Sequence, residues 1–488
     1  MPSQTKADLL KAAAMAPSDF AMAKLLVLFD DGHSVCTNCV RRQWYTLTEG
    51  LWYCHDGDQL FDTYRDVCDA VLASAKDSHK EELRLINSEA DERSSRKEHQ
   101  KCLRKLAALD SNSKTKNVIS MASRMLYDGK FVETLDQNLD LIGLGGGQVY
   151  DLKKGLARAT IPSDRVSLST NISLQEVPEQ GHCSAVLRFI SDIFDGNCQS
   201  IDYVLKMLAS MCDGHTSDEL FHVLIGTGAN GKSKLQELMR LTLGSYYCTV
   251  PCTLFTGRRG GAQGATAAFE HLANKRAVFV QEPERGQRMN GGVLKELSGG
   301  DTIYSRGLFK SGREFKPQAK FVLVSNTLPD VQADDAALWR RLRAIPFEIT
   351  FKAKLQGNRE KKRDDKLSRK LVLWAPAFLH LLLTRYYPRY KKEGITDPPP
   401  AVLRSTSTYR KESCPLTAFC DENIQEAEQN MAKKQECVQF NVLVEKVRQH
   451  YRDATKRCPS QKKLEAWFEG KWGEMNALER GRGWEQEV

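Results

Sequence analysis

The spacing of apolar residues changes character along the first part of the chain, and each change predicts a different kind of element. Residues 1–30 have helical spacing with one apolar face. Residues 33–68 instead show strand-like alternation at Trp44–Leu47 and at Leu51–Tyr53. The Thr-Glu-Gly sequence at 48–50 fits a turn between these two runs. A helical segment followed by a β-hairpin is therefore expected at the N-terminal end.

Helical and strand-like patterns alternate in the rest of the chain. Residues 75–117 are rich in charges and helix formers but poor in apolar positions, which predicts a solvated helix or helix pair. Short strands and turns are expected over 131–175, and helical spacing returns over 184–213. Strand and helix patterns then alternate from 221 to about 350, which is typical of an α/β core. Residues 364–390 are helical in pattern.

A stiff Asp-Pro-Pro-Pro run at 397–400 separates the core from helix-like segments and loops that follow it. The fold class is therefore α/β. The chain is expected to have an N-terminal helical and small-sheet region, a domain preceding the core, the core itself, and a small C-terminal domain: 1–125, 126–215, 216–395 and 401–488.

Composition adds little to this picture. The net charge of +9 is weak support for a polyanionic partner. No uninterrupted apolar run of about 18 residues is present, so no membrane span is expected. The N-terminus lacks the basic and apolar regions of a secretory signal, which makes secretion unexpected. The 14 scattered cysteines are therefore interpreted as reduced thiols.

A phosphate-binding motif, Gly-x-x-x-x-Gly-Lys-Ser, lies between an apolar run at 221–225 and a helical segment. Glycines let backbone N–H groups surround phosphate oxygens, and the following helix presents its N-terminus to the same anion. Lys232 can bridge the β- and γ-phosphates, and the Ser233 hydroxyl can bind Mg²⁺. The alternative is a chance glycine-rich turn. The expected nucleotide-binding residues are Gly226, Thr227, Gly228, Ala229, Asn230, Gly231, Lys232, Ser233 and Lys234.

Polar residues follow two further apolar strands. Glu282 and Glu284 come after the run 277–280, where one carboxylate can hold Mg²⁺ and the other can deprotonate the attacking water. Glu282 is the preferred metal-side acid and Glu284 the preferred base, although the two could exchange roles or be plain surface acids. Asn326 ends the strand 320–326 and can donate to a γ-phosphate, or serve only as a turn residue.

The order of these elements resembles superfamily 3 helicases, especially the primase-helicases of phages, poxviruses and other large DNA viruses. The resemblance rests on GTGANGKS, LKELSGGD, FKPQAKFVLVSN and WRRLRAIPF. Upstream, LDQNLDLIGLGGGQVYDLKKG and FISDIFDGN resemble the domain that precedes the helicase core in this family. The resemblance to this family implies an AAA+-like P-loop ATPase core with an N-terminal collar and a C-terminal winged-helix-like domain.

The family resemblance also implies roles for individual residues. ATP and Mg²⁺ are the expected cofactors, with Lys232 and Ser233 on nucleotide and metal, and Asn326 as the sensor. The family works as a homohexameric ring, which places an arginine finger in the neighbouring subunit. Arg341 is the expected finger and Arg340 the second choice, the bland alternative being a solvated or nucleic-acid-facing cluster.

Residues 304–313 correspond to a hairpin that projects into the ring channel of the family. Arg306 and Lys310 suit the phosphates of a single strand, and Phe309 suits a base face. Arg313 completes the expected nucleic-acid-binding set. The alternative interpretation is an ordinary β-hairpin turn.

Two features depart from the family. Gly146-Gly147-Gln148 stands where an Asn-Gly is usual. Fewer than about 100 residues precede the recognised region, too few for a polymerase-type primase fold, so a separate primase or polymerase is an expected partner.

Two weaker patterns lie outside the core. Cys36, Cys39, Cys54 and His55 have the ligand types of a zinc site, but they could equally be reduced thiols and a histidine on a small sheet. Residues 440–472 resemble a winged-helix module whose cations could meet phosphate or only be solvated: Lys446, Arg448, Lys456, Arg457, Lys462 and Lys463.

The function that these patterns predict is an ATP-dependent DNA helicase acting on single-stranded and forked DNA, inside cells, at replication sites of a virus, phage or plasmid. One alternative is an ATPase that remodels or packages DNA without unwinding it. A further alternative is a replication scaffold that binds ATP without hydrolysing it.

Overall fold

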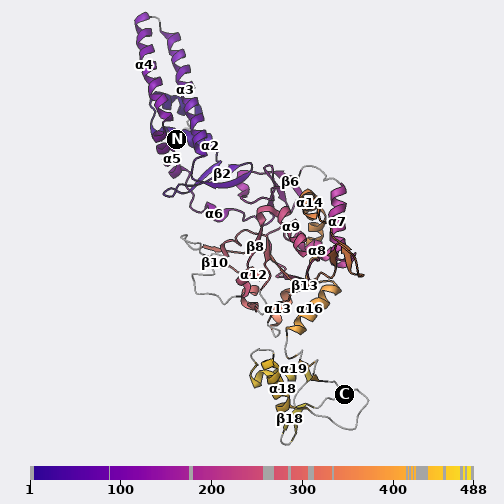
Figure 1. Cartoon of the computed structure of the whole chain (residues 1–488). Coiled ribbons are helices and arrows are strands. Elements are labelled where there is room, and N and C mark those ends of the chain that lie inside the picture. Colours follow the sequence, from indigo (N-terminus) through magenta and orange to yellow (C-terminus); the bar gives the residue numbers. More distant parts are fainter. Residues whose placement is uncertain are drawn as a thin grey trace.

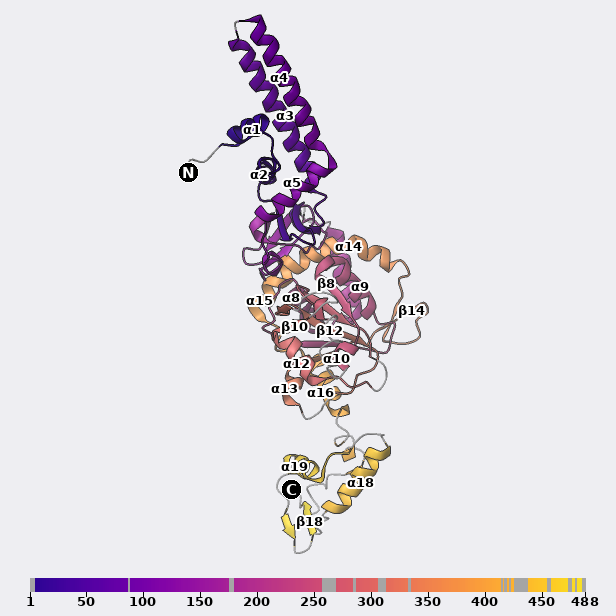
Figure 2. The ribbon, with the colours of Figure 1, turned by 90° about the vertical axis from the view of Figure 1, so that its left-hand side faces the viewer.

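The structure is a computed structural model in which most of the chain is described. The described residues are 5–86, 88–174, 180–256, 269–283, 287–305, 313–331, 335–413, 416, 419–420, 423–424, 438–453, 458–472, 476–478 and 481–484. A helical arm projects from one end of a body that contains the main sheet (Figures 1 and 2).

Helices surround a small antiparallel sheet in the N-terminal region. The helices are α1 (Lys6–Met15), α2 (Asp19–Asp30), α3 (Leu60–Leu85), α4 (Glu89–Ala107) and α5 (Asn112–Met125), with a 3₁₀ turn at Ala108–Asp110. The sheet pairs β1 (Ser34–Asn38), β2 (Gln43–Thr48) and β3 (Leu51–His55) in that order. Glu49 and Gly50 form the turn between β2 and β3 with φ of 49° and 76°, which confirms the predicted hairpin. α3 and α4 pair along the arm, which confirms the helix-pair interpretation of 75–117.

The next segment carries a second small antiparallel sheet and three helices. Its elements are α6 (Phe131–Thr134), β4 (Leu141–Gly143), β5 (Gln148–Asp151), β6 (Leu156–Ala159), a 3₁₀ turn at Pro162–Asp164, α7 (Gln180–Ile193) and α8 (Cys198–Ser210). The turn between β4 and β5 packs on the turn between β2 and β3, since a Cβ added at Gly50 would lie 2.8 Å from the Cα of Gly147. Gly50 is therefore needed for the close approach of these two backbones.

A five-stranded parallel sheet with the order β13-β7-β12-β9-β8 forms the centre of the body. The fold is thus mixed α/β with a parallel sheet. The strands are β7 (Phe221–Ile225), β8 (Tyr247–Val250), β9 (Ala277–Val280), β12 (Lys320–Ser325) and β13 (Leu342–Pro346). The remaining elements of the body are α9 (Lys232–Leu243), a 3₁₀ turn at Gly244–Tyr246, α10 (Thr253–Thr256), α12 (Gly291–Gly299), β10 (Ile303–Ser305), β11 (Arg313–Phe315), α13 (Ala336–Arg341), β14 (Thr350–Lys352), β15 (Glu360–Lys362), α14 (Leu367–Leu381), a π-helical turn at Leu382–Tyr386, α15 (Tyr387–Glu393) and α16 (Pro400–Glu412).

Both faces of the sheet are buried, as expected for parallel strands covered by helices. Alternate residues of each strand enter separate cores: in β9, Ala277 and Phe279 pack in one, and Val278 and Val280 in the other. The first core also contains buried residues of β4, β5, α7, α8, α9 and α14. The segment 126–215 therefore shares its hydrophobic core with the sheet.

Two buried cations at the amino ends of strands strengthen this connection. Arg276, 1% exposed, donates to the backbone carbonyls of Cys212 and Leu141 just before β9 begins. Lys320, the first residue of β12, donates to Asp213 Oδ1 at 2.6 Å. Removing one partner of such a buried pair leaves an uncompensated charge, which typically costs about 3–5 kcal/mol.

The expected domain boundary at 401 is wrong, because it falls inside α16. This helix packs on β13, where the Thr406 hydroxyl accepts from the backbone N–H of Ala344 at 2.9 Å. Tyr409 is buried in the second core and donates to the carbonyl of Pro329 at 2.6 Å. The body therefore extends through Glu412.

The C-terminal unit is small. It contains β16 (Val438–Gln439), α18 (Phe440–Asp453), α19 (Gln461–Trp472), β17 (Asn476–Leu478) and β18 (Gly481–Trp484). The three strands form an antiparallel sheet in the order β16-β18-β17. Its helices bury their own cluster, which includes Phe440, Val447, Leu464 and Phe468.

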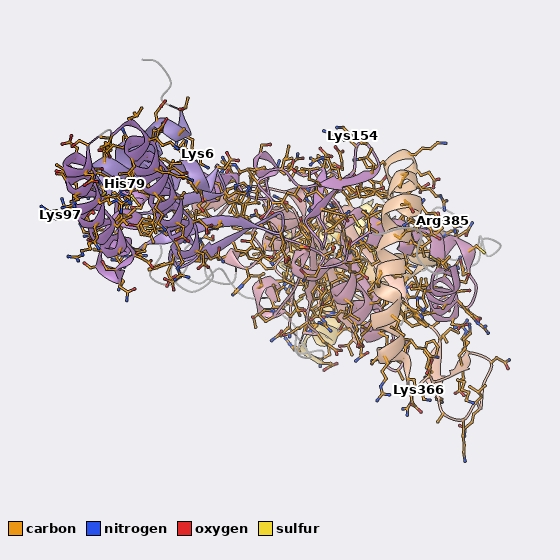
Figure 3. The ribbon with its side chains drawn as sticks, turned by 90° about the horizontal axis from the view of Figure 1, so that it is seen from above. Lys6, His79, Lys97, Lys154, Lys366 and Arg385 are labelled. Atoms are coloured by element: carbon orange, nitrogen blue, oxygen red, sulfur yellow. The ribbon has the colours of Figure 1, made fainter. Side chains whose placement is uncertain are left out.

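One helical stretch, Leu367–Glu393, is long and apolar enough to cross a membrane by length and composition alone. It lies along the body between Lys366 and Arg385 (Figure 3). Its α14 part packs against α7 and α9, and Leu371, Phe378 and Leu379 are fully buried in the first core. These contacts are those of a core helix.

Candidate functional site

The loop after β7 is shaped by glycines at positions where other residues would clash or be strained. Gly228 and Gly231 have φ of 103° and 89°. A Cβ at Gly226 would lie 2.5 Å from the carbonyl oxygen of Phe347, and one at Gly231 would lie 2.9 Å from Cγ1 of Ile193. The backbone is thus free to curl into α9, whose first residue is Lys232.

A neighbouring segment holds this loop from the side through its backbone. The N–H of Phe351 donates to the carbonyl of Ala229 at 2.7 Å, and the N–H of Phe347 donates to Ile225 at 2.7 Å. The side chain of Asn230, 3% exposed, donates to the carbonyl of Phe347 at 3.4 Å. The loop is therefore held by β14 and by Phe347, which directly follows β13.

Lys232 lies under the loop with its ammonium between two neutral oxygen atoms. Its Nζ donates to the carbonyl of Gly226 at 2.6 Å and to Asn326 Oδ1 at 3.1 Å. Burial lowers the pKa of Lys232 to about 8, and the nearby Glu282 carboxylate opposes that shift. A buried ammonium without a hydrogen-bonded carboxylate of its own is suited to binding an anion.

Glu282 and Asn326 are joined at the carboxyl ends of β9 and β12. The backbone N–H of Asn326 donates to Glu282 Oε1 at 2.7 Å, and its Nδ2 donates to Oε2 at 3.1 Å. The sheet order explains this arrangement, because β12 lies between β7, which precedes the loop, and β9, which precedes Glu282. The structure therefore brings Lys232, Glu282 and Asn326 together, although they come from three separate strand ends.

The other residues expected at the nucleotide are placed differently. Ser233 is exposed in the first turn of α9, where its hydroxyl is open to a ligand. The Lys234 side chain turns away, with Nζ donating to Ser368 Oγ at 2.6 Å and to Glu237 Oε2 at 2.8 Å. Lys234 can therefore contact a nucleotide at the N-terminus of the helix through its backbone N–H but not through its side chain.

The two candidate finger arginines differ sharply in exposure. Arg341 Nη2 bonds to Glu219 Oε2 at 2.6 Å and Nη1 to the carbonyl of Ala337 at 3.1 Å, and its side chain is only 12% exposed. Arg340 contacts the same carboxylate at 3.2 Å but is 69% exposed. Arg340 is therefore the more accessible of the two arginines, whereas Arg341 is held within its own chain.

Several expected residues cannot be placed. Glu284, Arg306, Phe309 and Lys310 lie outside the described residues. Arg313 begins β11, which pairs antiparallel with β10 so that Ser305 is opposite Arg313. The segment 306–312 is therefore flanked by two paired strands, as the hairpin interpretation requires.

Of the four residues in the zinc interpretation, the structure brings Cys36 and Cys39 together, whereas Cys54 and His55 contact other partners. Cys36 Sγ lies 3.8 Å from Cys39 Sγ, whereas Cys54 is exposed and receives a contact from Gln43 at 3.6 Å. His55 Nε2 is 2.7 Å from the Thr46 hydroxyl. Within the described residues, no three His, Cys, Asp or Glu side chains are grouped to hold a metal ion.

Some residues that shape the site were not found from the sequence. Glu219 anchors two arginines more than 120 positions away, and Phe347 and Phe351 hold the loop through backbone atoms only. No local pattern identifies such contacts. An acidic residue just before the first core strand is a weak signal that could have suggested Glu219.

Two family models match parts of the chain. The model described as D5 N terminal like matches residues 22–195. A family of unknown function, DUF5906, matches residues 224–341, which include the loop, Glu282, Asn326 and both arginines.

Relatives occur in large DNA viruses. A helicase-named protein of Acanthamoeba polyphaga mimivirus is 30% identical over 476 residues, covering 94% of this chain and 48% of the relative. A helicase-named protein of Frog virus 3 is 28% identical and covers 57% of this chain and 30% of its own length. A primase-named protein of African swine fever virus is 24% identical, and the match covers 65% of this chain and 34% of the relative. The chain spans about half of these relatives' length or less. The matches support a D5-like viral primase-helicase family.

A solved structure was also matched. The apo C-terminal region of NrS-1 is 15% identical and covers 64% of this chain and 78% of its own, with a TM-score of 0.42.

The low pKa of Lys232 gives the stability of the folded chain a specific dependence on pH. The ordinary lysine pKa is 10.5 and the folded value is about 8, so the unfolded chain binds more protons between these values and stability rises with pH across this window. Lys232→Met removes this pH dependence. The free energy of unfolding of the variant minus that of the wild type should therefore fall by about 2 kcal/mol from pH 7.5 to 9.5. Denaturant unfolding at both pH values measures this difference. A constant difference would show that Lys232 is not held in a desolvated site.

Proposed function

We propose that the chain is the motor part of an ATP-dependent DNA helicase of superfamily 3. It acts as a hexameric ring on single-stranded and forked DNA at sites of viral, phage or plasmid replication. Relatives named helicase in large DNA viruses support a replication role of the helicase or primase kind and suggest an enzyme. A separately encoded primase or polymerase is the proposed partner.

The observation that carries the proposal is the set of hydrogen bonds among Lys232, Asn326 and Glu282. An ammonium, an amide and a carboxylate converge beside a loop whose backbone can surround phosphates. These are the groups that phosphoryl transfer to water needs for charge stabilisation, positioning of water and metal binding.

The residues present also fit Mg²⁺. The exposed Ser233 hydroxyl and the Glu282 carboxylate supply oxygen ligands of the type that Mg²⁺ prefers. Bound there, the metal would neutralise charge on the phosphates. The chain itself would use Lys232 to bind the β- and γ-phosphates and Asn326 to hold the attacking water. Glu284 is retained as the proposed base.

An arginine from the next subunit completes the proposed site. Arg340 is exposed and lies at the end of α13, next to the edge strand β13. Arg341 has a different task, because its bonds to Glu219 and Ala337 keep it in its own chain. We infer that Arg341 positions the end of α13 so that Arg340 faces outward.

The paired strands β10 and β11 support the nucleic-acid part of the proposal. They would present Arg306, Phe309 and Lys310 to a single strand, with cations on phosphates and the aromatic ring against a base. The C-terminal unit, with two helices and a three-stranded antiparallel sheet, supports a winged-helix interpretation and a second contact with DNA.

The first test removes the ammonium from the site. Lys232→Ala should lower DNA-stimulated ATP hydrolysis by about 10²-fold or more and abolish unwinding of a forked duplex, because both depend on one phosphate contact. Arg240→Ala, at an exposed position of the same helix, serves as the matched control and should keep both activities. Phosphate release and strand separation are measured on the same preparations. Unwinding by Lys232→Ala above one tenth of the wild-type rate would contradict the proposal.

The second test separates the two arginines. Arg340→Ala should lower ATP hydrolysis by about 10²-fold or more without lowering Tm, since its side chain is exposed. Arg341→Ala should lower Tm by several degrees, because it removes a largely buried guanidinium that donates to Glu219 and to the carbonyl of Ala337. An equimolar mixture of Arg340→Ala and Lys232→Ala subunits should recover part of the activity, since some interfaces regain both groups. Unchanged hydrolysis by Arg340→Ala alone, or a mixture no more active than its two components measured separately, would exclude a finger at this position.

A further inference from the structure

The helical arm extends well beyond the hydrophobic core that anchors it (Figures 1 and 2). Near its base, α3 buries Tyr64, Val67 and Val71 against the N-terminal helices, and α4 buries Leu106. Farther out, among the described residues beyond Ala75 on α3 and before Leu106 on α4, only Ser95 is buried. The outer half of the arm therefore adds almost nothing to the core, and its presence calls for another purpose.

Polar contacts between the two helices stiffen this outer half. The rings of His79 and His99 stack at 3.8 Å with an interplanar angle of 9°. Ser95 Oγ is 3.3 Å from His79 Nδ1. Arg96 pairs with Glu92 one turn away along α4. The arm is thus a pair of helices. The contacts between the facing sides of α3 and α4 determine which residues of α4 point to solvent.

The outward side of α4 is a stripe of cations. The acids Glu89, Asp91 and Glu92 are confined to its first turn, and from 93 to 105 six cations stand against the single acid Glu98. At 100° per residue, Arg93, Lys97, Lys101 and Arg104 fall on one face, opposite buried Ser95 and Leu106. All four are exposed, and Lys97 lies on the side of the arm away from the body (Figure 3).

Few of these charges are neutralised within the chain. Arg93 is 4.0 Å from Glu89, and both side chains are more than four-fifths exposed, so this pair contributes little. In the described part of the chain, Lys97, Lys101 and Arg104 form no ion pair within 4.0 Å. Three like charges spaced along one helix face repel one another, which favours a polyanionic partner along that face.

We propose that this basic stripe of α4 (Arg93, Lys97, Lys101 and Arg104) binds the phosphate backbone of duplex nucleic acid. Over 93–104 a helix rises about 16 Å, the length of about five base pairs of duplex, along which phosphates are dense. No Phe, Tyr or Trp lies in α4, whereas single-strand sites use aromatic stacking. The partner follows from the proposed function, since a forked substrate has a duplex arm, but the binding itself needs no ATP.

Binding of a 20-base-pair duplex of arbitrary sequence, measured by fluorescence anisotropy without nucleotide over a range of salt concentrations, tests the proposal. The triple variant Lys97→Gln, Lys101→Gln and Arg104→Gln keeps helix-forming side chains and removes three charges. We expect it to weaken binding by about tenfold or more and to lower the slope of log affinity against log salt by up to about 2.7.

A matched control removes the same charge from the other helix of the arm. Lys76, Lys80 and Arg84 are exposed on α3, and their replacement by Gln should change the affinity by less than about twofold. Equal losses for both triple variants would overturn the proposal, because net charge alone would explain them. The proposal would also be overturned if the α4 variant lost binding only to a single strand of the same length, or only to anionic phospholipid vesicles, and kept its binding to the duplex.

Failure here is distinguishable from failure of the proposed function. The α4 triple variant should retain wild-type ATP hydrolysis in the absence of DNA, whereas Lys232→Ala should retain duplex binding while losing hydrolysis. Loss of duplex binding by Lys232→Ala as well would contradict an independent site on the arm.

Discussion

The candidate site depends on one side chain, the amide of Asn326, which is hydrogen-bonded to an ammonium on one side and a carboxylate on the other. Its oxygen accepts from Lys232 and its nitrogen donates to Glu282. An amide can do both at once, and neither Asp nor Leu could. This is possible only because β12 lies between the strands that deliver the other two residues. The order of the strands therefore determines that Lys232, Asn326 and Glu282 can be hydrogen-bonded to one another.

The surroundings of the site make that arrangement rigid on one side and open on another. The backbone of Phe347 and Phe351 holds the loop, and shared cores on both faces of the sheet fix the strands. In contrast, Ser233 and Arg340 are exposed. A preorganised interior with exposed groups at its rim suits the proposed site, in which a ligand and an arginine of a second subunit would complete the set. The helical arm shows the same division, with a buried base and a charged outer half.

Patterns local in sequence predicted much of this structure. Gly-x-x-x-x-Gly-Lys-Ser, the Thr-Glu-Gly turn and the charged helix pair each depend on residues within a few positions of one another, so they are readable from the sequence. Contacts between distant residues were not. Glu219 bonds to Arg341, Gly50 approaches Gly147, and α16 packs on β13 across the Pro-rich break, so the last domain boundary was wrong. A proline run stiffens the backbone, but it says nothing about where the next apolar face will be buried.

The most direct measurement of the central claim is an electron cryo-microscopy structure with a non-hydrolysable ATP analogue, Mg²⁺ and forked DNA. The account expects Lys232 Nζ to leave the Gly226 carbonyl for the phosphates, with the Asn326 amide within hydrogen-bond distance of the γ-phosphate and a neighbouring subunit's arginine facing it. An analogue bound away from the loop, or an unchanged Lys232–Gly226 contact beside bound nucleotide, would contradict it.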